Sequence, residues 1–329
     1  MGKKILVTGG AGYIGSFMVR QLAEKNYEVV VLDNLSYGHI EAVKDFRLEK
    51  IDLVTDTQKL DDLFENEKFS AVVHMASFIQ MGESFVNPAK YYLNNVVGFL
   101  NLMEAMRKGN CKKIVLSSSA GVYGNPERLP IDENDSKDPL NPYGETKYIM
   151  ERILEDYDGA YEIKFVSLRY FNAAGASLDG SIGEAHSEES HLIPNIITKA
   201  IKGEEIEIFG SDYDTPDGTC IRDYIHVLDL VEAHSLALEF LDNGKSEVFN
   251  LGIGKGYSNK EIIEMIKKVT GLELKIKYGP KRVGDANSLY ASNEKIKKVL
   301  GWIPKYNLKD IVKSSFIWHN THPNGYKNI

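Results

Sequence analysis

The chain has 329 residues, of which 43% are hydrophobic and 26% are charged, and its formal net charge is −8. These values are ordinary for a globular protein of about two domains, and the negative charge gives no reason to expect nucleic acid or an anionic membrane as a partner. The two cysteines, Cys111 and Cys220, are too few for a disulfide framework or a cysteine metal site. The sequence starts directly with a strand pattern rather than a signal sequence and has no run of membrane-spanning length, so we expect a cytoplasmic protein.

The first half of the sequence alternates short apolar runs with helical patterns. We expect strands over residues 4–7, 28–32, 47–51, 70–74, 113–117 and 164–168. We expect helices over residues 13–24, 57–66, 89–107 and 143–157. This alternation predicts an α/β fold with a doubly wound, parallel, Rossmann-type sheet, which binds ligands beyond the carboxyl ends of its strands.

The alternation weakens after residue 170, where shorter elements follow a loop rich in glycine, serine and acidic residues. We expect helices over residues 191–201, 226–241, 258–269, 293–300 and 308–319, and strands over residues 205–209, 248–251 and 273–278. Ser258 and Glu261 form the pattern of a capping box at the start of one of these helices. We therefore expect a first domain over residues 1–170 and a smaller α/β ligand-binding region over residues 171–329, interleaved with the first.

The stretch from Thr8 to Gly15 is rich in glycine and lies between the first strand and the first helix. Gly10, Gly12 and Gly15 satisfy the dinucleotide fingerprint, and Gly9, Gly12 and Gly15 satisfy its wider-spaced variant. In either register one glycine allows the tight turn, one lets a pyrophosphate approach the backbone, and one lets the helix pack on the strand. An ordinary tight strand-to-helix turn is the alternative interpretation of these glycines.

The second strand ends at Asp33, eighteen residues beyond Gly15. This is the place of a carboxylate that accepts hydrogen bonds from the adenosine ribose and repels a 2′-phosphate. No arginine or lysine follows Asp33 until Lys44. The sequence therefore predicts NAD, rather than NADP, as the cofactor.

A second stretch, from Asn141 to Lys147, carries groups suited to proton transfer. Pro142 is well placed to open a helix, on which Tyr143 and Lys147 lie one turn apart. A nearby ammonium and a positively charged nicotinamide would both favour the phenolate and lower the pKa of Tyr143 from about 10. Such a phenolate takes a proton from a substrate hydroxyl while a hydride leaves the same carbon. The alternative is a partly exposed tyrosine and a surface lysine on an amphipathic helix.

Three serines, residues 117–119, end a predicted strand upstream of this helix and place hydroxyls at the same edge of the sheet. The glycine loop, the serines and the Tyr-x-x-x-Lys spacing together resemble the extended short-chain dehydrogenase/reductase superfamily. Further strings resemble the UDP-glucose 4-epimerase family within it, at residues 117–124, 169–172, 217–227, 250–252 and 282–285. The resemblance runs from about residue 3 to about residue 320, and the string over residues 217–227 is its most specific part.

The resemblance implies an NAD-dependent isomerase that transiently oxidises C4 of a UDP-hexose and returns the hydride to the other face. Tyr143 would be the base, Lys147 would hold it and the nicotinamide ribose, and Ser119 would hydrogen-bond the reacting oxygen. The resemblance implies contacts with NAD from the glycine loop and from residues at the ends of three later strands, two of which carry an acidic residue and would bind the adenosine. The residues are Gly9, Gly12, Tyr13, Ile14, Gly15, Asp33, Asn34, Asp52, Leu53 and Met75.

The resemblance also implies the residues that bind the sugar nucleotide. Asn172 would contact it, Arg222 and Arg282 would bind the diphosphate, and Asp285 would contact a ribose. Bidentate guanidinium groups suit a diphosphate and supply local positive charge that an acidic chain otherwise lacks. An ion pair with Asp223, or with Asp229, is the alternative role for Arg222.

Three positions differ from the family pattern or set its substrate range. Ile79 stands where the family often has a lysine that contacts the cofactor, and Gly121 replaces a common threonine. Leu289 stands where small residues admit a 2-N-acetyl group and tyrosine tends to exclude it. Because leucine is intermediate in size, we expect UDP-glucose and UDP-galactose as substrates and leave the N-acetyl forms open.

The family is commonly homodimeric through two helices per subunit, which points to residues 89–107 and 143–157.

Two other functions remain open from the sequence. A nucleotide-sugar 4,6-dehydratase would need an extra acid–base pair just after the serines, where Ala120 and Gly121 stand and neither transfers a proton. A non-catalytic NAD(H)-binding regulator is compatible with the same fold. Such a regulator has little reason to keep Ser119, Tyr143 and Lys147 at reactive spacing.

Overall fold

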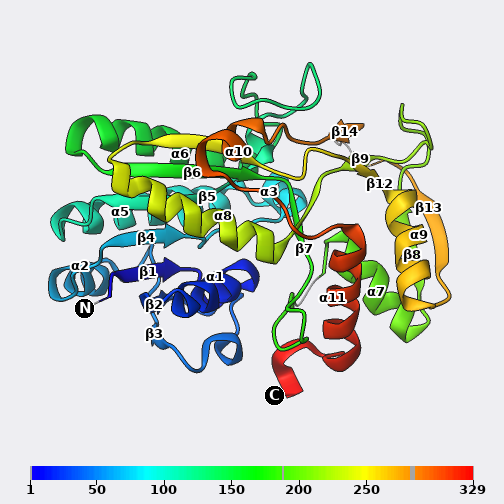
Figure 1. Ribbon diagram of the computed structural model, residues 1–329, viewed down its shortest axis with the longest axis horizontal. Coiled ribbons are helices and arrows are strands. Elements are labelled where there is room, and N and C mark those ends of the chain that lie inside the picture. The colour runs from blue at the N-terminus through cyan, green and yellow to red at the C-terminus, as the bar shows by residue number, and fades with distance from the viewer. Residues whose placement is uncertain (1, 187–188, 282–285, 329) are drawn as a thin grey trace.

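We describe a computed structural model of the protein over residues 2–186, 189–281 and 286–328. Its centre, within the described residues, is a seven-stranded parallel sheet of order β11-β6-β5-β4-β1-β2-β3 (Figure 1). Its strands are β1 (Lys4–Thr8), β2 (Glu28–Leu32), β3 (Arg47–Glu49), β4 (Ala71–His74), β5 (Lys113–Ser119), β6 (Lys164–Tyr170) and β11 (Glu247–Leu251).

Helices cover both faces of this sheet because its strands are apolar on both sides. Ile5 and Val7 of β1 belong to a core shared with α1 and α8, whereas Leu6 between them belongs to a core shared with α2, α5 and α6. The helices associated with the sheet are α1 (Tyr13–Glu24), α2 (Thr57–Asn66), α3 (Met81–Val86), α4 (Pro88–Tyr91), α5 (Gly98–Lys108), α6 (Pro142–Tyr161), α8 (Val227–Phe240) and α10 (Glu294–Leu300).

A second, smaller lobe lies beyond one end of the sheet and has its own isoleucine-rich core (Figure 1). Its helices are α7 (Leu192–Lys202), α9 (Asn259–Thr270) and α11 (Leu308–Thr321). Short strands join the lobe to the sheet or lie within it: β7 (Asn172–Ala174), β8 (Glu205–Phe209), β9 (Ile221–Arg222), β10 (Tyr224–His226), β12 (Tyr257–Ser258), β13 (Lys275–Gly279) and β14 (Ser288–Leu289). No helix in the described ranges is both long and apolar enough to cross a bilayer.

The predicted α/β class and parallel sheet are confirmed. Helices α1 and α2 have the predicted bounds, and Ser258 and Glu261 form the predicted capping box. The prediction of one continuous helix over residues 89–107 is wrong in detail, because a π-helical segment, Tyr92–Val97, lies between α4 and α5. Hydrophobic periodicity does not reveal this irregularity, because the side chain that accompanies it, Asn95, is polar and buried.

Candidate functional site

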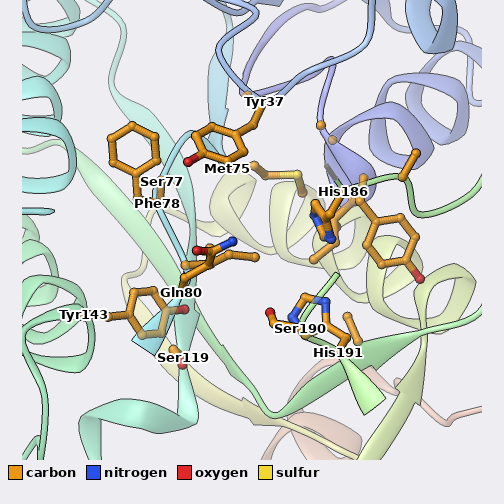
Figure 2. A pocket seen from close by; sticks show the side chains of 18 of the residues that line it. Tyr37, Met75, Ser77, Phe78, Gln80, Ser119, Tyr143, His186, Ser190 and His191 are labelled. Atoms are coloured by element: carbon orange, nitrogen blue, oxygen red, sulfur yellow. The ribbon is translucent and has the colours of Figure 1, made fainter. Parts of the chain in front are cut away.

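The site lies beyond the carboxyl ends of β1, β4 and β5, where a cavity of about 240 Å³ opens between the sheet and the smaller lobe. Its lining comes from the glycine loop, from the segment after β4, from the end of β5 and the start of α6, and from residues of the second half of the chain. Tyr143 and Ser119 project into it from one side, and His186 and His191 project from the other (Figure 2). Gly9, Gly12, Tyr13, Ile14, Gly15 and Met75 all line this cavity.

The contacts of the glycine loop explain the glycines of both registers, since a Cβ on Gly10 would lie 2.8 Å from a Val31 methyl group. Gly9 has a φ of +67°, and a Cβ there would lie 2.6 Å from the Ala76 nitrogen. A Cβ on Gly15 would lie 2.1 Å from the Gly9 oxygen, so this residue allows the close approach of helix and loop. A Cβ on Gly12 would meet only the Gly9 oxygen at 3.3 Å and would otherwise fill open space. Gly12 also caps α1 without a side-chain hydrogen bond, so the helix start is accessible to phosphate.

A second cavity of about 110 Å³ shares Gly9, Gly12 and Met75 with the first and extends toward β2. Asp33 and Leu53 lie in its lining with Asn34. The Asp33 carboxylate accepts hydrogen bonds from the backbone N–H groups of Ala11 (3.0 Å) and Leu35 (2.8 Å), and burial raises its pKa. These bonds fix the carboxylate at the place where an adenosine ribose would lie. The two cavities and their glycine loop fit an extended dinucleotide.

Asp52 lies beside this second cavity but is absent from its described lining. Its carboxylate accepts hydrogen bonds from the Asn34 side chain (2.7 Å) and from the N–H groups of Val54 and Thr55. Asp52 therefore orients Asn34 in this structure. Its predicted contact with adenine stays a prediction.

Tyr143 and Lys147 lie on the first two turns of α6, which Asn141 caps by accepting a hydrogen bond from the Gly144 N–H. Both side chains are buried. The Lys147 ammonium donates to the Ser77 hydroxyl and to the Ser117 carbonyl, each at 2.8 Å, and lies 6.0 Å from the centre of the Tyr143 ring. Ser77, which follows β4, and Ser117 of β5 thus hold the lysine beside the tyrosine, as the four-residue spacing of the pair predicted.

The pKa of Tyr143 is shifted in the opposite direction from the expected lowering. Burial raises the pKa of the Tyr143 phenol, and a hydrogen bond with Ser119 opposes that rise. Burial lowers the pKa of the Lys147 ammonium to about 7, and the nearby Glu151 carboxylate raises it. The sequence does not reveal how far both groups are removed from water. A phenolate at this position requires further positive charge, such as that of an oxidised nicotinamide.

A backbone hydrogen bond holds the Ser119 hydroxyl oxygen in place. Its oxygen accepts a hydrogen bond from the Gly121 N–H at 3.0 Å, which leaves its own proton to be donated toward Tyr143 or toward a substrate oxygen. A Cβ on Gly121 would lie 3.3 Å from the Ser119 oxygen, so the glycine keeps this side of the hydroxyl uncrowded.

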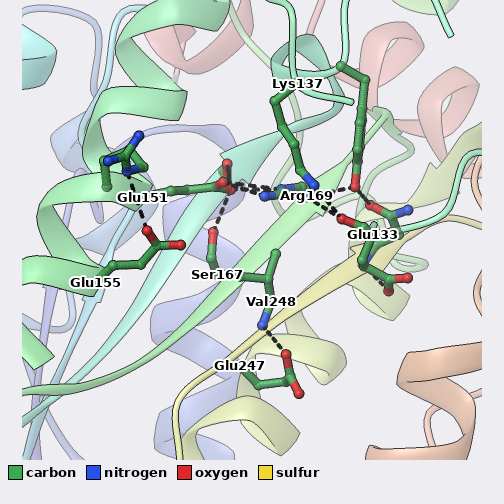
Figure 3. Close-up of polar contacts among 12 residues, drawn as sticks. Glu133, Lys137, Glu151, Glu155, Ser167, Arg169, Glu247 and Val248 are labelled. Carbon is green, nitrogen blue, oxygen red and sulfur yellow. Dashed lines mark hydrogen bonds and ion pairs between the residues drawn. The ribbon is translucent and has the colours of Figure 1, made fainter. Parts of the chain in front are cut away.

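A buried polar network holds α6 to the sheet directly behind the catalytic face (Figure 3). Glu151, one turn after Lys147, accepts hydrogen bonds from the hydroxyls of Ser118 (2.6 Å) and Ser167 (2.8 Å). It also forms a two-pronged ion pair with Arg169, whose shortest distance is 2.6 Å. Arg169 in turn donates to the Tyr123 hydroxyl at 2.8 Å. Because Glu151 and Arg169 are both buried, each neutralises the other at a site where an unpaired charge would be costly.

The predicted substrate-binding residues differ in where they lie relative to the larger cavity. Asn172 lines the larger cavity, and its amide donates to the Asp223 carbonyl at 3.0 Å. Arg222 lies on β9, between β12 and β14, and is not part of the described cavity lining. Arg282 and Asp285 lie outside the described residues, so their predicted roles stay predictions.

Several lining residues were missing from the sequence prediction. They are mostly aromatic or polar side chains on loops and irregular segments: Tyr37, Gln80, Tyr170, Phe171, His186, Ser190, His191 and Tyr326. Tyr170 closely follows a predicted strand, so its position at the sheet edge was a usable signal. His186 and His191 belong to a loop, and no local pattern indicates that it folds over the cavity. Ile79, where the family often has lysine, also lines the cavity.

The comparisons with known proteins agree with this geometry. Residues 5–252 match the model of the NAD dependent epimerase/dehydratase family. The chain is 49% identical to a UDP-glucose 4-epimerase of Lactobacillus helveticus over 99% of both chains. A crystal structure of UDP-glucose 4-epimerase from Brucella ovis in complex with NAD is 43% identical, has a TM-score of 0.92, and is aligned over 95% of this chain and 97% of its own.

A third similar protein is the UDP-Glc/GlcNAc 4-epimerase from Campylobacter jejuni. It is 42% identical, has a TM-score of 0.85, and is aligned over 97% of this chain and 100% of its own. The family match covers most of the chain, and the glycine loop, Ser119 and Tyr143 line the larger cavity while Asp33 lines the second. This chain therefore belongs to the NAD-dependent epimerase/dehydratase family, in its UDP-glucose 4-epimerase branch.

Proposed function

We propose that this protein is a UDP-hexose 4-epimerase that interconverts UDP-glucose and UDP-galactose with NAD as its bound cofactor. The observation that carries the proposal is the group formed by Tyr143, Ser119 and Lys147 at the wall of a cavity that begins at a dinucleotide-binding loop. A fold of this class alone does not specify an activity. The activity follows from these three side chains, and full-length relatives named UDP-glucose 4-epimerase support it.

The chain's own residues account for the proton part of the reaction. The bound NAD supplies the hydride acceptor and donor. Tyr143 takes the proton from the O4 hydroxyl and returns it when the hydride comes back. Ser119 donates a hydrogen bond to the same oxygen and limits the charge that develops on it. Lys147, fixed by Ser77 and Ser117, supplies the positive charge that favours the phenolate.

We propose that residues 1–170 bind mainly NAD and that residues 171–329 bind mainly the UDP-sugar, with the two parts interleaved. Support comes from the cavity lining, which contains the glycine loop from the first part and Asn172 from the second. Strand β11, far along the second part, pairs with β6 of the first, which supports the interleaving. Arg222, Arg282 and Asp285 remain the proposed ligands of the nucleotide.

We propose that the N-acetyl forms are secondary substrates. Leu289 is half-buried and packs against the cluster of Val122, Tyr123 and Ile131. Leucine is intermediate in size between the small residues that admit the N-acetyl group and the tyrosine that tends to exclude it. The Campylobacter jejuni relative is named for both UDP-Glc and UDP-GlcNAc. The ratio of kcat/KM for UDP-galactose and UDP-N-acetylgalactosamine measures this preference, and a hundredfold preference for the N-acetyl form would reverse the order.

We further propose a cytoplasmic homodimer. The few cysteines suit a reducing compartment. Leu93, Val97 and Leu100 are exposed and repeat at helical spacing on the π-helical segment and α5, and Phe85 and Val86 of α3 are exposed nearby in the chain. Exposed apolar residues that share one helix face are typical of an interface. A copy of the same surface is the proposed partner.

The experiment that tests the function is direct. Purified protein is incubated with UDP-galactose, and the products are separated by chromatography. UDP-glucose should form without consumption of added cofactor, because oxidation and reduction balance in each turnover. Release of a stable 4-keto-6-deoxy sugar would instead indicate the dehydratase, although Ala120 and Gly121 offer it no acid–base pair. Absence of any turnover, with NAD still bound, would favour the regulator.

A further inference from the structure

Four side chains converge on the wall of the larger cavity opposite Tyr143: Glu184, His186, Glu189 and His191. They lie between β7 and α7, and their potential ligand atoms are all within 4.8 Å of one another. Among the described residues they form a group with mixed imidazole and carboxylate donors. His186 and His191 project into the cavity (Figure 2). The reaction derived above uses none of the four.

We propose that these four side chains form a binding site for one divalent transition-metal ion, with zinc as the best-fitting metal. This inference does not depend on the proposed epimerase activity, because it follows from the donor atoms and their spacing.

The distances between donor atoms fit a four-coordinate ion. Zinc bonds to histidine nitrogen and carboxylate oxygen are about 2.0–2.2 Å, so the edges of a zinc tetrahedron are about 3.3–3.5 Å. The His186 Nδ1 atom lies 3.2 Å from Glu184 and 3.4 Å from Glu189. The His191 Nδ1 atom lies 3.5 Å from Glu189 and 2.5 Å from Glu184. These separations use one oxygen of Glu184 and both oxygens of Glu189. A four-coordinate ion would take one of the two Glu189 oxygens, and the short separation between His191 and Glu184 would open by about 1 Å.

The direction of the rings supports the same conclusion. Both imidazoles turn Nδ1, rather than Nε2, toward the two carboxylates, and their centres are 5.4 Å apart. One oxygen of Glu184 faces both nitrogens, and Glu189 presents one oxygen to each ring. Each nitrogen therefore faces both carboxylates, which is the pattern of an N₂O₂ ligand set around a common centre.

The chemistry of the donors selects the class of metal. Mg²⁺ and Ca²⁺ prefer six or more oxygen ligands, which this group does not offer. Imidazole nitrogens together with carboxylates suit Zn²⁺ and its transition-metal neighbours. The site is also held by its surroundings: the Trp318 indole donates to the Glu184 carbonyl at 2.8 Å, and the His191 N–H donates to the Glu189 carboxylate at 2.8 Å. Such outer contacts orient the ligands before the metal arrives.

The charges of two carboxylates and one divalent ion cancel, so the cluster would have no net charge with both imidazoles as neutral ligands. The ion can reach the site because the His191 side chain is 42% exposed.

The test is calorimetric titration of the untagged, full-length protein with zinc chloride. We expect one equivalent of Zn²⁺ to bind. His186→Asn and His191→Asn should each weaken binding by at least about 100-fold. His322→Asn, at a partly exposed histidine outside the cluster, should leave it unchanged. If a histidine variant does not fold, Glu189→Gln serves instead, and it should also weaken binding.

A second measurement uses Co²⁺ in place of Zn²⁺. Four-coordinate Co²⁺ absorbs visible light much more strongly than six-coordinate Co²⁺, and the wild-type protein should show the strong bands at one equivalent. Binding of less than one equivalent, binding unaffected by His186→Asn and Glu189→Gln, or a weak six-coordinate spectrum would each overturn the assignment. None of these readouts requires turnover, so failure of the epimerase assay would leave them interpretable.

Discussion

At the scale of single residues, the Tyr143 phenol is the proposed general base. We expect Tyr143→Phe to lower kcat for UDP-galactose by about 10²- to 10⁴-fold, because this is the usual contribution of a positioned general base. Binding of NAD and UDP-sugar should change little, since phenylalanine keeps the ring and its burial. Tyr148→Phe, on the same helix and outside the cavity lining, is the matched control and should keep full activity. Turnover near the wild-type rate in Tyr143→Phe would remove this residue from the mechanism.

Ser119 is the second residue whose effect has a predictable sign. Its hydrogen bond lowers the pKa of Tyr143, which burial raises. Removing the hydroxyl in Ser119→Ala should therefore raise that pKa, and the pH at which kcat rises to half of its maximum should move upward. The measurement is kcat between pH 6 and 10 for the wild type, Ser119→Ala and the control Ser136→Ala, at an exposed serine outside the lining of both cavities. A lower kcat with an unmoved pH profile would show that Ser119 only positions the substrate.

At the scale of elements, helix α6 presents Tyr143, Lys147 and Glu151 on successive turns of one face. Glu151 ties the helix to β5 and β6 through Ser118 and Arg169, and its charge raises the pKa of Lys147, which burial lowers to about 7. Glu151→Gln removes that charge and lowers the Lys147 pKa further. Because the protonated lysine is the form proposed to be active, the alkaline side of the kcat profile should move to lower pH.

The same variant should also lose stability, because Arg169 is left with a buried, uncompensated charge that costs about 3–5 kcal/mol. Both effects are measured together, as Tm and as the pH profile with NAD present. Glu155→Gln, one turn further along α6 and exposed, is the matched control and should change neither (Figure 3). A lower Tm with an unchanged pH profile would mean that Glu151 acts on the fold alone.

At the scale of the whole molecule, the exposed apolar residues of α5 and the π-helical segment predict self-association. Leu93→Glu combined with Leu100→Glu places charge on the proposed interface and should convert a dimer into a monomer, because buried unpaired carboxylates are strongly unfavourable. Ile303→Glu changes an equally exposed apolar residue elsewhere and should leave the dimer intact. Light scattering after size-exclusion chromatography measures the mass, and a wild-type monomer would contradict the prediction.

The sequence was informative wherever a function depends on neighbours along the chain. The strand–glycine–helix order, the acid at the end of β2 and the spacing of Tyr143 and Lys147 are local patterns, and the structure places Asp33, Tyr143 and Lys147 at the predicted edge of the sheet. The roles assigned to Arg222, Arg282 and Asp285 came from resemblance and remain predictions. The boundary at residue 170 also remains one, and β11 shows why it is hard to draw: a strand can join a sheet that ended 77 residues earlier in the chain.

Periodicity, turn chemistry and motif spacing thus determined the fold class, the cofactor loop and the reactive pair, because each of these is set by residues that are close in sequence. Only the tertiary structure decided how deeply Tyr143 and Lys147 are buried, and hence the direction in which their pKa values move. It alone brought Glu151 and Arg169 together, and it alone placed the His186–His191 cluster against the cavity. Burial and the convergence of side chains from distant segments are properties of packing, and no local pattern contains them.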